Sequence, residues 1–342
     1  MRLGVPYRFV RSVVTAMLLG SAVLAAGQDM HFSQYDFSPL HVNPALTGIF
    51  RGDMRFSGIY RSQWESVPVP YQTFSGACDI KFYDKDLENT LFAGGLLLNY
   101  DESGDGRLRT THIGISTSVT QQLSEQQLLT LGVQFNAIQR ALMQSDLTFG
   151  NQFDGEQFNP SLSTGEDFES ALATYSSFSI GLNWHFQLPH KRTRIDAGVA
   201  LNHFNEPAVS FLGDQRSLLG SRFTLFTRGT VPVAANIDVV GKFLAQRQGE
   251  YAETLIGAGV LMHISQTVGR ELSFQIGGGY RFGDALIPEA HLYYGPWIFG
   301  LSYDVNTSAF SVATRRQGGF ELSAVYLFTK VRPIPLKICP VF

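Results

Sequence analysis

The chain has little cysteine and little charge, and each shortage excludes a class of protein. Its two cysteines, Cys78 and Cys339, are too few for the disulfide framework of a small secreted domain. Cys78 lies in a strand pattern and Cys339 in the C-terminal tail, so we expect two unpaired thiols. Charged residues make up 16% of the chain, against roughly 25% in soluble domains.

Patterns for metals and nucleic acids are also missing. The eight histidines do not follow the spacings of zinc sites. Acid-rich loops around Asp101 and Asp154 do not match the ligand spacing of an EF-hand. No basic stripe indicates nucleic-acid binding. We therefore expect no metal, no cofactor and no nucleic-acid partner.

The first 27 residues have the three parts of a signal peptide. Arg2, Arg8 and Arg11 form a basic start, an apolar run follows over residues 13–24, and small residues precede Gln28. The apolar run is shorter than the roughly 20 residues that a spanning helix needs. The rest of the sequence contains no apolar run of that length. An exported chain of this kind belongs either in the periplasm or extracellular space, or in the outer membrane as a barrel.

Aromatic residues and glycine are abundant, and they follow a period of two. The chain has 34 Gly, 27 Phe and 13 Tyr. In the last ribbon, residues 295–328, the large apolar Trp297, Phe299 and Leu301 alternate with the small or polar Gly300 and Ser302. This period predicts a β-strand with one apolar and one polar face.

The same alternation recurs fourteen times. In the clearest strand, Phe178, Ile180 and Leu182 oppose Ser177 and Ser179. Arg281 and Asp304 fall on the polar face of their strands, where a polar lumen can hold them. The expected strands are 53–62, 71–82, 91–100, 109–120, 127–140, 173–186, 194–204, 220–228, 235–245, 253–264, 271–282, 286–294, 296–306 and 318–328.

The connections support a barrel that spans a membrane. With the N-terminus in the periplasm, the long connections 141–172 and 205–219 both face outward, as in outer-membrane barrels. An even strand number also closes the sheet without an exposed edge. We predict an all-β fold, a transmembrane antiparallel β-barrel of the outer-membrane type over residues 53–328, with about 14 strands.

Two segments lie outside the strand pattern. Residues 28–52 are expected to be either a periplasmic lead-in or an N-terminal arm or plug folded against or into the barrel. Glycines inside the strand patterns, such as Gly94 and Gly277, indicate bends, bulges or close packing of an inner element. The tail, residues 329–342, carries Lys330, Arg332 and Lys337 between prolines, and is either a disordered periplasmic end or a docking segment for a periplasmic protein.

Catalysis has weak support. A Ser/His pair inside the barrel wall would resemble an outer-membrane phospholipase, but no nucleophile elbow is present. At the first outward hairpin, Arg61 and Trp64 have the chemistry of partner surfaces, although Trp64 also suits a membrane interface.

A set of motifs occurs in order along the chain, in the segments 28–35, 38–40, 43–48, 60–64, 301–306, 318–321 and 339–342. Together these motifs resemble the PorP/SprF family of type IX secretion system outer-membrane proteins, over nearly the whole mature chain. Ser62 departs from the Asn that is common in this family within the Arg-x-Gln-Trp segment.

The resemblance implies a non-enzymatic barrel of the secretion and gliding machinery. Its partners would be outer-membrane lipid, other type IX components such as periplasmic ring proteins, and the C-terminal domain of a secreted adhesin. The alternative is an outer-membrane channel for hydrophobic or small solutes. The candidate partner-binding residues are Asn43, Pro44, Arg61, Trp64, Lys330, Arg332, Lys337 and Phe342.

Overall fold

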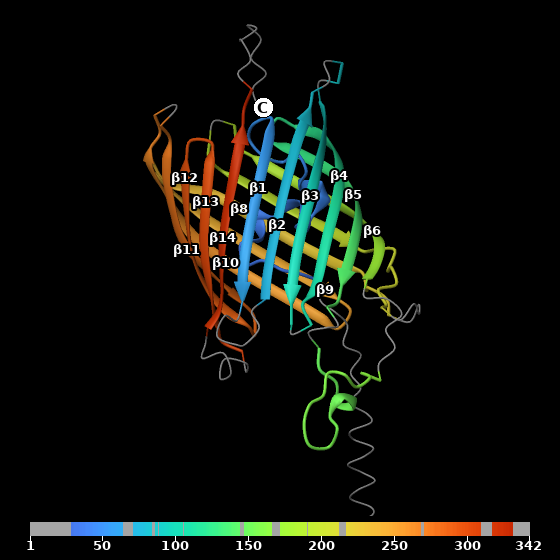
Figure 1. Cartoon of the computed structure of the whole chain (residues 1–342). Coiled ribbons are helices and arrows are strands. Elements are labelled where there is room, and N and C mark those ends of the chain that lie inside the picture. The colour runs from blue at the N-terminus through green and yellow to red at the C-terminus, as the bar shows by residue number, and fades with distance from the viewer. Residues whose placement is uncertain are drawn as a thin grey trace, which may run out of the picture.

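The computed structural model is a closed barrel of fourteen antiparallel strands in which each strand pairs with its neighbours in sequence and β1 pairs with β14 (Figure 1). It describes residues 29–63, 71–83, 86–87, 89–104, 106–143, 147–165, 172–189, 191–211, 217–267, 270–308 and 317–330. The strands are β1 (Met54–Gln63), β2 (Tyr71–Phe82), β3 (Thr90–Ser103), β4 (Leu108–Ser124), β5 (Gln127–Ala141), β6 (Leu172–Gln187), β7 (Arg194–Asn202), β8 (Arg222–Ala234), β9 (Ile237–Gln248), β10 (Tyr251–Ser265), β11 (Leu272–Arg281), β12 (Ala285–Tyr294), β13 (Trp297–Asn306) and β14 (Gln317–Phe328).

The fold class and strand number predicted from the sequence are confirmed. The largest differences in bounds concern β8, which continues to Ala234 and a tight turn at residues 235–236, and β4, which continues to Ser124. Strand β7 ends at Asn202 rather than at residue 204, because His203 has a positive φ of 55° and leaves the extended conformation.

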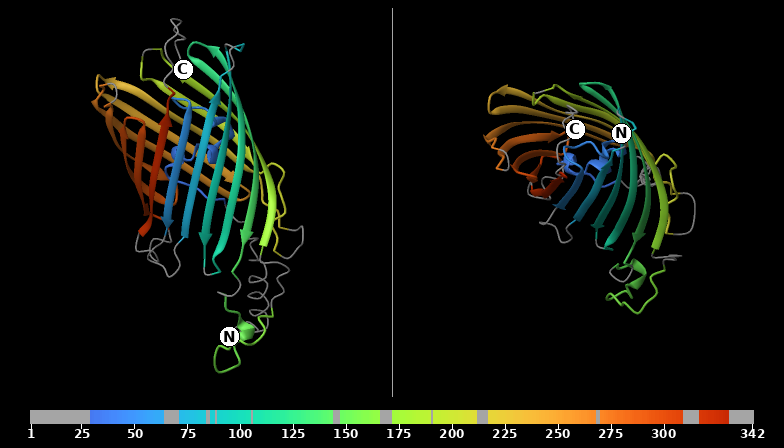
Figure 2. Two further views of the ribbon diagram at one scale, coloured as in Figure 1. Left: turned by 45° about the horizontal axis from the view of Figure 1, so that its top comes forward. Right: turned by 90° about the horizontal axis from the view of Figure 1, so that it is seen from above.

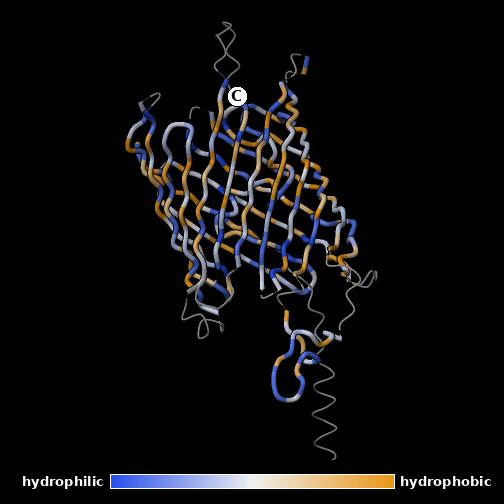
Figure 3. Tube along the Cα trace, viewed as in Figure 1, coloured by the Kyte–Doolittle hydropathy of each residue, from blue (hydrophilic) through white to orange (hydrophobic). Residues whose placement is uncertain are grey.

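The two faces of the wall follow the predicted alternation, which Figure 3 shows as alternating colours along each strand. In β6, Phe178, Ile180 and Leu182 are exposed on the outside, while Ser177 and Asn183 are fully buried on the inside. This surface suits the hydrocarbon of a bilayer. No helix within the described ranges is long and apolar enough to cross a membrane.

The barrel has two different ends. We call the end with the connections 142–171 and 203–221 the loop end, and the end where β1 begins and β14 finishes the turn end. Residues 147–165 project from the loop end and include the short helix η4 (Gly150–Gln152) (Figure 1).

Residues 29–52 lie inside the barrel (Figure 2). We call this segment the arm. It contains three short helical turns, η1 (Tyr35–Phe37), α2 (Pro39–Val42) and η2 (Pro44–Leu46). Its first described residue, Asp29, contacts Arg222 and Gln248 at the loop end, whereas the chain leaves the lumen at Asp53, which pairs with Phe328 at the turn end. The arm therefore passes through the lumen from end to end.

Glycines on the inner wall make room for the arm. A Cβ built on Gly132 of β5 would lie 2.4 Å from backbone atoms of Pro44 and Ala45. A Cβ on Gly95 of β3 would lie 2.7 Å from a methyl carbon of Leu40. These strands must present glycine where the arm crosses them, since real Cβ contacts are longer.

Candidate functional site

The candidate site is the filled lumen with its two ends. Near the loop end, Arg61 Nη2 donates to Asp304 Oδ2 at 2.8 Å, and Arg281 Nη1 lies 3.2 Å from the same oxygen. Arg281 Nε also lies 3.1 Å from Glu253 Oε1. Glu321 completes the cluster, 3.4 Å from Arg61 Nε. All five side chains are buried, so each charge depends on this pairing.

The loop-end cluster holds the arm through its backbone. Glu321 accepts the backbone N–H groups of Ser33 at 2.7 Å and Gln34 at 2.8 Å. The Ser33 hydroxyl donates to Asp304 at 2.6 Å. Arg61 donates to the carbonyl oxygen of His31. Charge-assisted bonds of this kind are the strong ones, and they fix the entry of the arm into the lumen.

A second buried pair holds the arm near the turn end. Arg55 grips Asp79 with two bonds, of 2.8 and 2.7 Å, in the fork geometry typical of arginine and carboxylate. Asp79 also accepts the N–H of Gly48 at 2.8 Å, and Arg55 donates to the carbonyl of Leu46 at 3.0 Å. The end of the arm, like its start, is therefore held by buried charged groups.

Between these two clusters, Asn43 ties the arm to the opposite wall. Its Nδ2 donates to the carbonyl oxygens of Leu182 at 3.1 Å and Val199 at 3.0 Å. Its Oδ1 accepts the N–H of Ala45 at 2.8 Å and so caps η2. The inner glycines of β5 and β6 leave space for this turn.

A Ser–His–Asp chain is present at the loop end. Ser177 Oγ lies 2.5 Å from His203 Nδ1, and His203 Nε2 lies 2.6 Å from Asp29 Oδ2. Serine hydrolases place the serine on Nε2 and the acid on Nδ1, so the two nitrogens have exchanged roles here. Ser177 is also fully buried. This chain therefore anchors the arm and is not arranged to attack a substrate.

Asp29 has an ionised carboxylate in this anchor. Burial alone would raise the pKa of Asp29, but the charges of His203 and Arg222 and the bond to His203 lower it well below its usual range. The first described residue of the arm is thus held at the loop end by charge.

A similar chain joins Ser273, His263 and Asp238 near the turn end, at 2.9 and 2.8 Å. Again the serine is on Nδ1. Asp238 also accepts a hydrogen bond from Arg192 Nε at 2.9 Å. Ser273 and His263 are cross-strand partners. The arrangement is a polar ladder between neighbouring strands.

The predicted site residues are divided between the lumen and the ends of the chain. Asn43, Pro44 and Arg61 are buried in the lumen and contact other parts of the same chain. Lys330 lies at the turn end, where its backbone N–H donates to Asp53 at 2.7 Å. Trp64, Arg332, Lys337 and Phe342 lie outside the described residues.

Arg281 and Asp304 lie on the inner face, as predicted, but the loop-end cluster was not predicted. One signal was available, because Arg61 and Glu321 also fall at inward positions of their strands. The described residues include no group of three or more His, Cys, Asp or Glu placed to hold a metal ion. Among the described residues Cys78 is a free thiol, and Cys339 lies outside them.

The arm leaves a cavity at each end of the barrel. The loop-end cavity is lined by four acids, Asp29, Asp101, Asp284 and Asp304, and by no lysine or arginine. The turn-end cavity is lined by five cations and three acids. The two ends therefore offer different electrostatic surfaces to molecules that approach from opposite sides.

Solved structures similar to this chain are barrels with low sequence identity. The translocator domain of the autotransporter NalP from Neisseria meningitidis is 11% identical, with a TM-score of 0.40, over 93% of this chain and 98% of that one. A FadL homologue from Pseudomonas aeruginosa is 10% identical, with a TM-score of 0.45, over 84% and 93%. No curated protein matches the chain.

The family comparison covers most of the chain. Residues 24–326 match the model of the type IX secretion system membrane protein PorP/SprF. That range includes the arm and nearly the whole barrel. The barrel, with its apolar outer surface, is an outer-membrane fold, and the chain belongs to the PorP/SprF family of type IX secretion system membrane proteins.

Proposed function

We propose that this barrel is a non-enzymatic outer-membrane component of the type IX secretion and gliding machinery. It would aid the export or surface anchoring of secreted proteins, including adhesins, through protein–protein contacts. Export to the outer membrane would follow removal of residues 1–27 as a signal peptide. The observation that carries the proposal is the filled lumen.

The filled lumen favours contacts over transport. The arm donates backbone N–H groups to buried carboxylates near both ends, at Glu321 and Asp79, and Asn43 binds the wall between them. Hydrogen bonds to charged groups contribute roughly 1.5–3 kcal/mol each, so the arm is not easily displaced. A barrel closed in this way can still bind partners through its rims, its loops and its lipid-facing wall.

The turn end would face periplasmic ring proteins. The chain continues from Lys330 at this end, and the following Arg332, Lys337 and Phe342 supply positive charge and an aromatic group. We propose these residues, together with Lys330, as a docking segment.

The loop end would face the secreted protein. Trp64 directly follows in sequence Gln63, the last residue of β1, and β1 finishes at this end. The projecting segment 147–165 also exposes Phe153 and Phe158, which are 56% and 46% exposed and are joined by a β-bridge. Asp154 shapes the turn between them by accepting the N–H groups of Glu156 and Gln157, each at 2.9 Å. Exposed aromatics on an ordered loop suit a protein contact.

A crosslinking pull-down from outer membranes tests the two surfaces separately. One variant ends after Phe328 and so lacks the tail. A second carries Phe153→Ser with Phe158→Ser and keeps the tail. We expect the first to lose periplasmic ring subunits and the second to lose a large secreted surface protein.

The matched control is Phe135→Ser, because Phe135 is 44% exposed in the middle of β5, away from both ends of the barrel. If neither partner class is recovered with the intact protein, and the protein conducts ions in planar bilayers, the proposal is wrong and the channel alternative gains support.

A further inference from the structure

The turn-end cavity has two unlike walls and a roof formed by the arm. Arg194 of β7, Arg228 of β8 and Lys242 of β9 line one wall. Ile298 of β13 and Val325 and Leu327 of β14 line the other, and β7 and β14 lie on opposite sides of the barrel. Asp36 and Ile49 of the arm form part of the roof. The cavity therefore combines a cationic side with an apolar side.

The cavity is lined by five cations and by three acids, Asp36, Asp196 and Glu289, and Arg55 is also paired with Asp79, so one positive charge remains in excess. Arg55 is bound to Asp79, and Lys242 lies 2.5 Å from Glu289. Arg228 Nε lies 3.2 Å from Asp196 Oδ2. Asp196 is already shared, because its other oxygen lies 2.7 Å from His185 Nδ1. These three carboxylates are therefore occupied.

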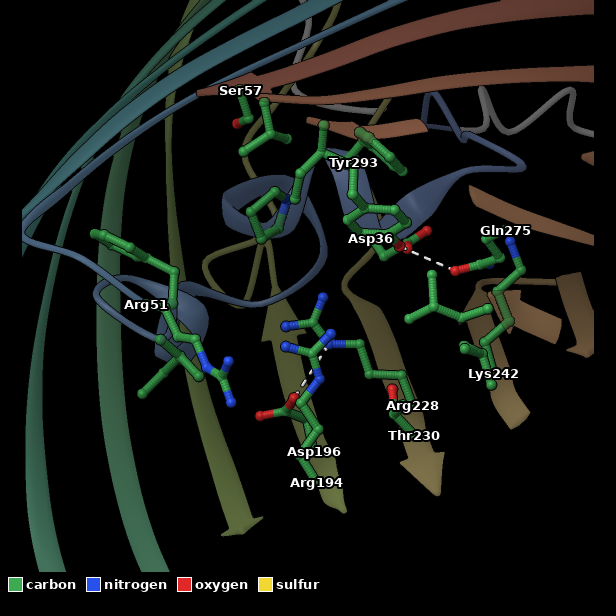
Figure 4. A pocket seen from close by; sticks show the side chains of 18 of the residues that line it. Asp36, Arg51, Ser57, Arg194, Asp196, Arg228, Thr230, Lys242, Gln275 and Tyr293 are labelled. Atoms are coloured by element: carbon green, nitrogen blue, oxygen red, sulfur yellow. Dashed lines mark hydrogen bonds and ion pairs between the residues drawn. The ribbon is translucent and has the colours of Figure 1, made fainter. Parts of the chain in front are cut away.

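Arg51 and Arg194 are left without a carboxylate within ion-pair distance among the described residues. Figure 4 shows the Arg51 side chain extending toward the guanidinium groups of Arg194 and Arg228, with Asp36 and Lys242 on the other side of the cavity. Arg51 comes from the arm and is exposed at the rim. Three guanidinium groups from three elements thus converge, with one shared acid between them.

The size of the cavity limits what it can hold. It measures about 170 Å³, below the roughly 300–1,000 Å³ of sites for drug-sized ligands. Guanidinium groups match carboxylate and phosphate oxygens in bidentate pairs. The apolar side chains on the opposite wall would be removed from water if an alkyl group of the ligand covered them, which is favourable.

We propose that the turn-end cavity binds a small amphiphile that carries one carboxylate or phosphate. The oxyanion is bound by Arg51, Arg194 and Arg228, and the apolar part lies on Ile298, Val325 and Leu327. The ligand enters from the turn end, where Arg51 is exposed. This site is independent of the protein contacts proposed above, because it lies inside the rim.

The test uses the full-length barrel in lipid nanodiscs and isothermal titration with four probes: hexyl phosphate, hexanoate, hexanol and inorganic phosphate. We expect hexyl phosphate or hexanoate to bind, and the stronger of the two identifies the oxyanion. Hexanol and inorganic phosphate should each bind at least about tenfold more weakly, since each lacks one half of the ligand.

Two variants test the arginines. Arg194→Gln should weaken binding of the preferred probe about tenfold or more. Arg51→Gln should do the same, and because Arg51 is exposed at the rim, its substitution does not threaten folding. Arg270→Gln is the control, since Arg270 is exposed at the same end and does not line the cavity. Equal affinity in Arg51→Gln and Arg270→Gln would overturn the proposal, as would hexanol or inorganic phosphate binding as tightly as the preferred probe.

Discussion

Substituting a single inner glycine should loosen the arm without breaking the barrel. Gly132 of β5 faces the lumen where η2 crosses it, and an added Cβ would meet Pro44 C, Pro44 O and Ala45 N at 2.4 Å. All three are backbone atoms, which cannot rotate away as a side chain can. In Gly132→Ala the arm must therefore move as a body.

The expected loss of free energy in arm docking follows from the crowding of the added methyl group against the arm. Extra methylene groups in a packed interior cost typically about 1–3 kcal/mol, and the contact with backbone atoms places this case near 3 kcal/mol. The barrel itself gains roughly 0.5–1 kcal/mol, because alanine is better than glycine inside a strand. The arm should therefore be weakened while the wall is not. A loss of about 3 kcal/mol raises the open fraction of the arm about 100-fold.

Hydrogen exchange of backbone amides measures that open fraction directly. The reporters are the N–H groups of Ser33 and Gln34, bound to Glu321, and of Gly48, bound to Asp79. We expect them to exchange about 100-fold faster in Gly132→Ala, while amides within the strands keep their rates.

Gly58→Ala is the matched control, since a Cβ at Gly58 has no heavy atom within 4 Å. If the arm amides of Gly132→Ala and Gly58→Ala exchange at the same rate, the arm does not occupy the lumen as described.

Two further predictions concern the pH dependence of arm docking and the effect of a charge on the outer face of the wall. The pKa of Asp29 in the folded protein is held well below its usual range, so its contribution to arm docking is complete above about pH 4 and is lost only as the pH falls through the folded pKa. Protection of the arm amides, corrected for intrinsic rates, should stay constant from pH 7 to pH 5 and fall in stronger acid, and a decline already at pH 5 would contradict this. Leu96→Arg, at mid-strand on the outer face, should cost about 2–4 kcal/mol in urea unfolding from lipid vesicles, whereas Leu123→Arg, near a strand end, should cost about 0–1 kcal/mol. Both leucines are similarly exposed, at 58% and 55%, so equal costs would argue against a membrane-spanning wall.

The wall of the barrel could be predicted because its signal is local. Apolar and polar residues alternate within each strand, so the pattern can be recognised one strand at a time. In β6 the exposed Phe178 and the buried Ser177 lie on the faces that were predicted. The bounds of β2 coincide with the prediction, Tyr71–Phe82. The inward orientation of charged side chains such as Arg281 could also be predicted, because a charge on a lipid-facing position is destabilising.

The arm could not be placed from the sequence, because its contacts are remote. Asn43 donates to carbonyls 139 and 156 residues away. Every residue has a backbone carbonyl, so the sequence does not show which one accepts the bond. The turn-end cavity was missed for the same reason: Arg51, Arg194 and Arg228 come together only when β7 and β8 close around the arm.

The course of the arm also constrains how the molecule assembles. Ser33 and Gln34 are bound by Glu321, which is 288 and 287 residues away in β14, the strand that pairs with β1 to close the barrel. Closing such long loops is slow, and the carboxylate that secures the start of the arm arrives with the last strand. The start of the arm can therefore be bound in full only once β14 is in place. Arg61 of β1 and Glu321 of β14 both bind it, so opening the seam between these strands would separate the two groups that hold the start of the arm.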